Sequence, residues 1–140
     1  MGENNSNLKK MIKIYKPNGV DWMNFTLSRR NPYTFHHIIS RSDGGDDTIE
    51  NGAILTRRAH DLLHILEYAC PEVYEKLNAL FTEINANRKA PNDEIKKEIE
   101  EILHDIFDGS TYETTIEIDL SDFSNIYYGN KKYRMKKLRK

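Results

Sequence analysis

The sequence predicts an α+β fold in which two short strands are followed by helices and by a small C-terminal β element. A stretch rich in aromatic and β-branched residues at 33–39 and a short second strand at 53–56 lie on either side of a Gly-Gly turn. Apolar residues then recur at helical spacing between residues 57 and 106, and residues 114–120 alternate strictly between polar and apolar. With 140 residues, 38% of them hydrophobic, we expect one domain over residues 1–140.

The N-terminal third contains short elements separated by turn residues. Residues 1–7 are polar and are expected to form a flexible leader, and residues 11–15 alternate weakly, as in a short strand. The strands of the central pair are expected at 33–39 and 53–56. Between them, Gly44 and Gly45 permit a turn, because glycine adopts positive φ at little steric cost.

Three amphipathic helices are expected after the second strand. The first covers residues 57–68, where Thr56 can act as the N-cap. A second helix follows Pro71, and a third begins after Asn92. A strand at 114–120 and a hairpin turn at 128–131 would then form the C-terminal β element. The predicted parts are a motif core at about 33–68, helical support at 71–108, and the β element with a basic tail at 113–140.

Charge is strongly segregated along a chain whose net charge is only −1. Residues 1–42 sum to +5 and residues 126–140 to +7, whereas residues 43–91 sum to −4 and residues 92–125 to −9. Basic ends around an acidic middle indicate an anionic partner held at one surface.

The cysteine content and the hydropathy limit the class of protein. Cys70 is alone and cannot form an intramolecular disulfide or a four-cysteine zinc site, so we expect a reducing, cytoplasmic compartment. No apolar run approaches the ~20 residues that span a membrane, so no membrane partner is expected. Any bound metal must therefore be held by histidine, asparagine or carboxylate side chains.

Four of the five histidines lie between residues 36 and 64, the enrichment expected of a metal site with a general base beside it. His36 and His37 end the first predicted strand, where adjacent side chains point to opposite faces. One of them can therefore bind a metal while the other acts as a base. His60 and His64 are four residues apart on one face of the predicted helix. The fifth, His104, is interpreted as structural or solvated.

An ordered string of histidine, glycine and asparagine residues connects these positions. It consists of His36, His37, Gly44, Gly45, Asn51 and His60. With spacings of fourteen residues from His37 to Asn51 and nine from there to His60, the string resembles the HNH (ββα-metal, His-Me finger) endonuclease family. The resemblance covers about 35 residues. Unlike many members, the chain has no zinc-binding cysteine pairs, and Ser40 stands where proline is common.

The resemblance implies a role for each of these residues in the hydrolysis of DNA. His37 would be the general base, and Asn51 would brace the loop that carries it. The implied ligands of a divalent metal, Mg²⁺ or Mn²⁺ for the family, are His36, His60 and, as in its three-histidine branch, His64. Such a set would also bind Zn²⁺ or Ni²⁺. One site per chain would nick one strand, so cutting both would need a homodimer or two encounters.

Basic residues near the motif and at the C-terminus are candidates for nucleic-acid binding. They are Arg41, Arg57, Arg58, Lys136 and Lys137. The basic tail could instead serve only solubility, and His64 could hydrogen-bond Glu67. A rival hypothesis is a non-cleaving HNH-fold binding or inhibitor protein of phage or mobile-element origin, in which acidic residues 93–122 imitate the charge of a phosphate backbone. A third is a metal that serves structure alone.

Overall fold

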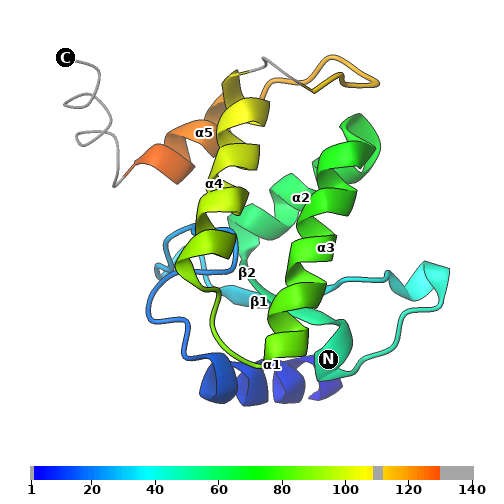
Figure 1. Cartoon of the computed structure of the whole chain (residues 1–140), viewed down its shortest axis with the longest axis vertical. Coiled ribbons are helices and arrows are strands. Elements are labelled where there is room, and N and C mark those ends of the chain that lie inside the picture. The colour runs from blue at the N-terminus through cyan, green and yellow to red at the C-terminus, as the bar shows by residue number, and fades with distance from the viewer. Residues whose placement is uncertain (1, 109–111, 130–140) are drawn as a thin grey trace.

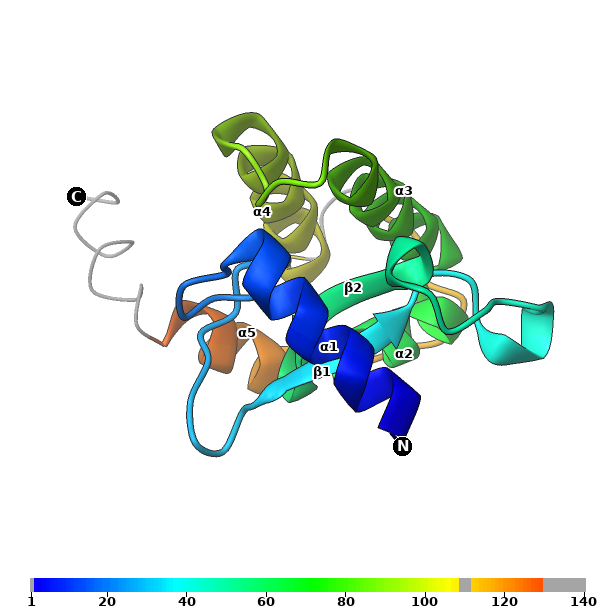
Figure 2. The same ribbon diagram turned by 90° about the horizontal axis from the view of Figure 1, so that it is seen from below.

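The protein is described by a computed structural model that covers residues 2–108 and 112–129 (Figure 1). The elements in chain order are α1 (Gly2–Tyr15), β1 (Tyr33–His37), two 3-10 turns (Arg41–Asp43 and Ile49–Asn51), β2 (Gly52–Thr56), α2 (Arg57–Ala69), α3 (Pro71–Asn87), α4 (Asp93–Asp108) and α5 (Ser121–Tyr128). The two strands lie between α1 on one side and α2 and α3 on the other. Figure 2 shows α1 crossing the near face of the strand pair.

The two strands and α2 form a ββα unit. β1 pairs antiparallel with β2, so that His36 lies opposite Ala53 and His37 opposite Gly52. α2 begins directly after β2, and the hydroxyl of Thr56 accepts a hydrogen bond from Ala59 N at 3.5 Å, which confirms the predicted N-cap. The α+β class and the three helices after β2 are confirmed, since the observed strands and helices lie within a few residues of the predicted ones.

A buried carboxylate joins the loop before β1 to the junction of β2 and α2. Oδ1 of Asp21 accepts hydrogen bonds from Met23 N at 2.8 Å and Phe25 N at 2.9 Å. Oδ2 accepts from both the backbone N and the hydroxyl of Thr56, each at 2.7 Å. Burial raises the pKa of Asp21 to about 6, and these hydrogen bonds oppose the shift. The carboxylate thus fixes the start of α2 and the position of His60 one turn later.

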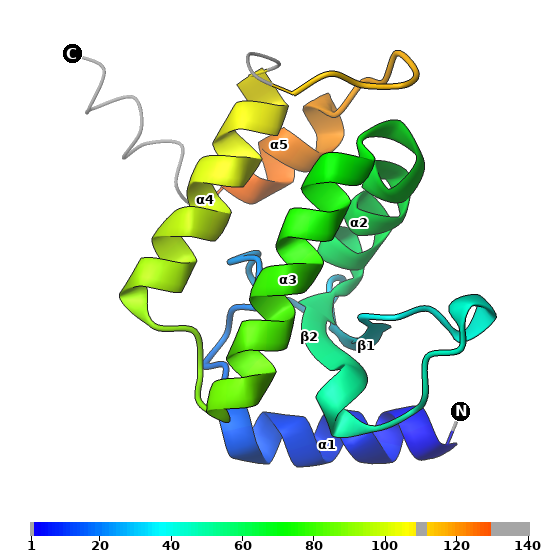
Figure 3. The same cartoon turned by 45° about the vertical axis from the view of Figure 1, so that its right-hand side comes forward.

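The hydrophobic core lies where α2 and α3 pack on the strands and α4 packs on α3. α2 buries Leu62, Leu63 and Leu66, and Phe81 of α3 meets Trp22 at a centroid distance of 6.0 Å. Each fully buried side chain of this size contributes about 1.5–3 kcal/mol relative to an exposed one. Figure 3 shows α3 lying between α2 and α4. The core thus supports the ββα unit through apolar contacts.

The N-terminal segment is helical, which corrects the expected leader at 1–7 and the expected strand at 11–15. α1 buries Met11 and Tyr15, which are four residues apart and share one face. The ring of Tyr15 packs against Trp22 at 5.0 Å, and its hydroxyl donates to Oδ1 of Asn85 at 2.7 Å. The helix forms because the face of the strand pair that carries Phe35 needs an apolar cover.

The predicted C-terminal β element is wrong for the described residues. Residues 114–120 pair with no strand; instead the backbone N of Thr115 donates to Ala69 O at 2.8 Å and its hydroxyl to Tyr68 O at 2.6 Å. These bonds cap the end of α2 and replace strand pairing. α5 then occupies the chain up to Tyr128, and residues 130–131 of the expected hairpin turn lie outside the described residues. No described helix has the length and apolarity needed to cross a membrane.

Candidate active site

β1 and α2 bring His36 and His60 together at the centre of the ββα unit. Their ring centroids lie 5.3 Å apart, with the ring planes at 80°. Two imidazoles bound to one ion at about 2.1 Å, at a tetrahedral angle, have centroids about 5 Å apart. His36 is only 3% exposed and also contacts the ring of Phe81 on α3. Two of the three predicted ligands therefore lie at a separation that suits a shared metal ion.

Hydrogen bonds leave one nitrogen of each ring with a free lone pair. The hydroxyl of Thr34 donates to Leu55 O at 2.8 Å, so its 2.9 Å bond with Nδ1 of His60 must be donated by the ring. Nε2 of His36 donates to Oδ1 of Asn78 at 2.9 Å. In the neutral rings, Nε2 of His60 and Nδ1 of His36 are therefore unprotonated. Metal-binding histidines typically donate their other N–H in this way, which fixes the ring orientation.

Burial favours the neutral form of both rings. Desolvation lowers the pKa of His36 to about 3 and that of His60 to about 4, and the neighbouring His64 lowers the pKa of His60 further. Neutral imidazole is the form that binds a metal ion. Both rings are therefore neutral throughout the neutral pH range.

His64 lies beside His60 on α2 but is more exposed. The two ring centroids are 4.7 Å apart with the planes at 22°. The side chain of His64 is 61% exposed, and its Nδ1 is 3.9 Å from Oε1 of Glu67, the alternative partner considered from the sequence. Among the described side chains, no three or more of histidine, cysteine, aspartate and glutamate form a cluster that could hold a metal ion. The structure thus brings the predicted ligands His36 and His60 close together, whereas the third, His64, lies at the exposed surface beside His60.

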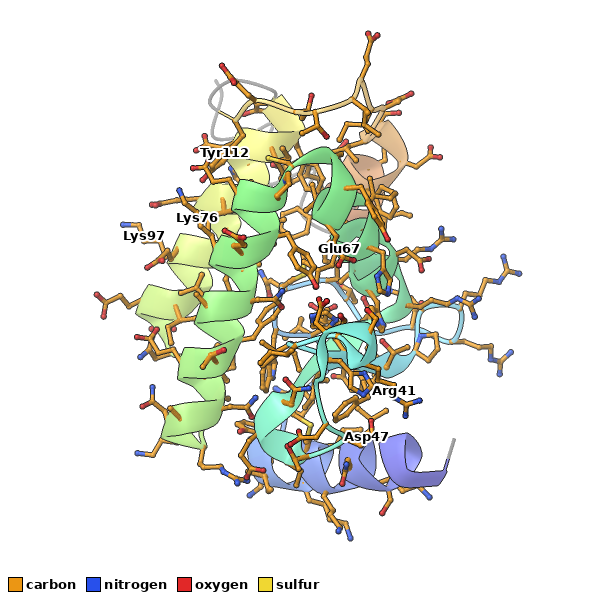
Figure 4. All side chains as sticks on the ribbon, turned by 90° about the vertical axis from the view of Figure 1, so that its right-hand side faces the viewer. Arg41, Asp47, Glu67, Lys76, Lys97 and Tyr112 are labelled. Atoms are coloured by element: carbon orange, nitrogen blue, oxygen red, sulfur yellow. The ribbon has the colours of Figure 1, made fainter. Side chains whose placement is uncertain are left out.

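His37 points to the opposite face of β1 from His36. Its ring packs edge-on against Phe35 at 5.0 Å, and its side chain is 16% exposed. Nε2 of His37 lies 2.6 Å from Oδ1 of Asp47, and Arg41 donates to both oxygens of that carboxylate at 3.1 Å. Figure 4 shows Arg41 and Asp47 close together on the loop that follows β1. The predicted phosphate contact Arg41 is therefore already held by an ion pair next to His37.

Asn51 ties both ends of this loop together. Its Oδ1 accepts a hydrogen bond from Ile39 N at 2.8 Å, and its Nδ2 donates to Ile39 O and to Asp46 O, both at 2.9 Å. Gly45 is required for this approach, because a Cβ there would lie 1.7 Å from Ile39 O and 2.9 Å from Nδ2 of Asn51. Gly44 supplies the turn with a φ of 91°. Gly45 is therefore more than the turn residue that the sequence suggested.

Four exposed arginines surround the start of α2, and we refer to them as the arginine surface. They are Arg29, Arg30, Arg57 and Arg58. The two pairs are joined because Oδ1 of Asn31 accepts from Arg58 N at 2.8 Å and Pro32 O accepts from Arg57 N at 2.9 Å. None of the four forms an ion pair within the described part of the chain. Arg57 and Arg58 were predicted to bind nucleic acid, and Arg29 and Arg30 were not.

Three further polar residues at the site could not be found from the sequence motif. Thr34 and Asn78 accept from the histidine pair, and Asp47 contacts His37. Thr34 precedes His36 by two residues, so strand periodicity places both on one face, and this is the signal that could have identified it. Asn78 lies 42 residues from His36 and gives no local signal. Lys136 and Lys137 lie outside the described residues.

A comparison with protein families gives this geometry its context. Residues 23–64 match the family model of the HNH endonuclease domain. The matched segment contains both strands, the loop with Asn51, and all four clustered histidines. No curated protein and no solved structure matches the chain. HNH nucleases act on DNA and typically use divalent metal ions. Residues 23–64 are therefore similar to the HNH endonuclease domain, which confirms the resemblance read from the sequence, and this domain suggests nuclease-type activity in general.

Proposed function

We propose that the protein is a metal-dependent endonuclease that hydrolyses phosphodiester bonds in DNA. The observation that supports this most strongly is the pair formed by His36 and His60. The two rings are largely buried, lie 5.3 Å apart, and each keeps one nitrogen free of the hydrogen bonds that orient it. A protein that only binds nucleic acid has no need for two neutral imidazoles at this spacing, whereas a metal site does.

The residues present fit a divalent metal ion. His36 and His60 would hold it, His64 would be the third ligand from the next turn of α2, and water and phosphate oxygens would complete its shell. Mg²⁺ or Mn²⁺ is the expected ion, and the imidazoles would also accept Zn²⁺ or Ni²⁺. When bound, the ion would neutralise charge on the scissile phosphate and on the leaving oxygen.

His37 is the proposed general base. A water molecule gives one proton to the His37 ring while its oxygen forms a bond to the phosphorus atom. The P–O bond to the leaving oxygen breaks, that oxygen keeps the electron pair, and it then takes a proton from solvent. Asn51 supports this step by bracing the loop against which the His37 ring lies. An imidazole with an unprotonated ring nitrogen can accept the proton of the attacking water, which is the chemistry that a general base needs.

The arginine surface and Arg41 are the proposed contacts for the DNA backbone. From Tyr33 to His37, β1 covers about 13 Å at about 3.3 Å per residue. The arginine surface lies at one end of this strand and Arg41 lies beyond the other. At about 3.4 Å per nucleotide, one DNA strand would cross this distance in about four nucleotides, with the histidines between the two basic groups. Lys136 and Lys137 would add contacts from the tail, and one site per chain would nick a single strand unless the protein dimerises.

Nicking of supercoiled plasmid tests the proposed function. The wild type and His37→Ala are incubated with Mg²⁺, Mn²⁺, Ni²⁺ or Zn²⁺, with His104→Ala on α4 as the matched control. Loss of a general base should slow nicking by about 10²–10⁴-fold without unfolding the protein, and the control should nick at the wild-type rate. Full activity in His37→Ala would contradict the role of His37. DNA binding without any cleavage by the wild type would favour the non-cleaving rival.

A further inference from the structure

The carboxylate of Asp47 is the closest polar partner of His37, and no part of the HNH string assigns it a role. We propose that Asp47 is a positioning residue that fixes the ring of His37 in one tautomer and one orientation, so that Nδ1 faces the attacking water. This inference rests on the proposed function, because it assigns a partner to the base of that reaction. It concerns a side chain that acts through His37 and does not itself touch the DNA.

The hydrogen bond between the two residues determines which ring nitrogen is free. Oδ1 of Asp47 and Nε2 of His37 are 2.6 Å apart. An ionised carboxylate can only accept, so Nε2 must carry the proton and Nδ1 must hold the lone pair. The hydrogen bond from His37 is also the largest cause that lowers the pKa of Asp47, so the carboxylate is the charged acceptor. The base that accepts a proton from water is therefore Nδ1.

The carboxylate of Asp47 is held in place by Arg41 on its solvent side. Nη2 of Arg41 donates to Oδ1 and Oδ2 at 3.1 Å, and Nε donates to Oδ1 at 3.2 Å. These bonds restrict the rotation of the carboxylate, because a planar guanidinium binds both oxygens at once. Within the described residues, no hydrogen bond of Arg41 uses its Nη1 group. The same guanidinium can therefore hold Asp47 and still donate to a phosphate oxygen.

The backbone at Asp47 is held independently of its carboxylate. Nδ2 of Asn51 donates to the carbonyl oxygen of the preceding residue, Asp46, at 2.9 Å. The side-chain amide of Asn7 on α1 donates to the carbonyl oxygen of Asp47 itself. The loop path therefore does not depend on the Asp47 side chain, and removing the carboxylate should release the His37 ring while the loop stays folded. If Asp47 served only to hold the loop, its removal would disturb the loop and the His37 ring together.

The tautomer of His37 gives a readout that does not require cleavage. Two-dimensional ¹H–¹⁵N spectra of the histidine rings, recorded at a pH where the ring is neutral, distinguish a protonated Nε2 from a protonated Nδ1. We expect the wild type to show the Nε2–H form alone and Asp47→Ala to show a mixture of both. Asp43→Ala is the matched control, since Asp43 lies on the same loop and pairs with Ser40. An unchanged His37 signal in Asp47→Ala would overturn the inference.

Single-site kinetics on a DNA duplex supply the second readout. Asp47→Ala should lower kcat by about tenfold or more, yet by less than the about 10²–10⁴-fold expected for loss of the base. The fall in kcat should exceed any change in KM, which can shift because Arg41, a proposed DNA contact, loses its ion pair with Asp47. Asp47→Asn keeps an acceptor at Oδ1 and should recover most of the lost rate. A rise in KM at constant kcat would show that Asp47 acts in DNA binding and would overturn the inference.

The two readouts also separate the inference from the proposed function. Absence of cleavage by the wild type with every metal would reject the nuclease. Wild-type cleavage together with an unchanged spectrum and rate in Asp47→Ala would reject only the role of Asp47.

Discussion

Acidification of the metal-free protein should destabilise the fold because His36 and His60 are held neutral. Their pKa values fall to about 3 and about 4 in the folded chain, below the ~6.5 of an unfolded histidine. At a pH between the folded and unfolded pKa values, the unfolded state therefore binds more protons than the folded state. The stabilising contribution is present above pH ~6.5 and is lost as the pH falls toward 4 and then 3. At pH 5, each ring is neutral when folded and charged when unfolded, which costs about 2 kcal/mol per ring.

The combined loss of about 4 kcal/mol is large against a typical folding stability of about 5–15 kcal/mol. It can be measured by urea unfolding in EDTA at pH 7.5 and pH 5.0, for the wild type and for His60→Gln. The glutamine can still bond with Thr34 but does not titrate, so the variant should lose only about half as much stability on acidification. The raised pKa of Asp21 acts in the opposite direction, but it is common to both proteins and cancels in the comparison. Equal losses in the two proteins would refute the reasoning.

Three other perturbations test separate parts of the site. Arg29→Gln combined with Arg30→Gln should reduce the slope of log affinity for DNA against log salt by about 1.8, because each lost phosphate contact removes about 0.9. Fluorescence-anisotropy titrations at several salt concentrations measure this slope. The control pair Lys96→Gln with Lys97→Gln on α4 should leave the slope unchanged, and equal slopes for both pairs would contradict the prediction. Thr34→Val should weaken Zn²⁺ binding by about 10–100-fold in calorimetry, because His60 loses the acceptor that orients it; an unchanged affinity would rule out this support. Gly45→Ala should lower the melting temperature by several degrees, because its Cβ would overlap Ile39 O at 1.7 Å; a wild-type melting temperature would show that the loop adapts freely.

The ββα unit could be predicted from the sequence because its determinants are local. Strand periodicity places His36 and His37 on opposite faces, and helix periodicity places His60 and His64 on one face. The glycine turn between the strands has its own sequence signature. The residues that orient the histidines were harder to predict from the sequence. Asn78 comes from α3, and only the packing of α3 against the strands brings it to His36.

The errors at the two ends of the chain have a common physical cause. The apolar residues around Met11 and those at 114–120 alternate in a way that suggests strands, but a strand forms only where an edge is available for pairing. In the structure, α1 covers one face of the strand pair, and Thr115 caps α2 through its backbone N and its hydroxyl. Tertiary packing therefore overrides the local period at both positions. Arg29 and Arg30 were missed for a related reason, since only Asn31 and Pro32 place them beside α2.

The arrangement of the histidines around the metal is the central claim, and anomalous diffraction from crystals soaked with Zn²⁺ tests it most directly. We expect one peak at a coordination distance of about 2.1 Å from Nδ1 of His36 and Nε2 of His60, with the ring of His37 outside the coordination shell. A peak bound by His37, or an ion that occupies another part of the protein and leaves His36 and His60 without a ligand, would contradict the account.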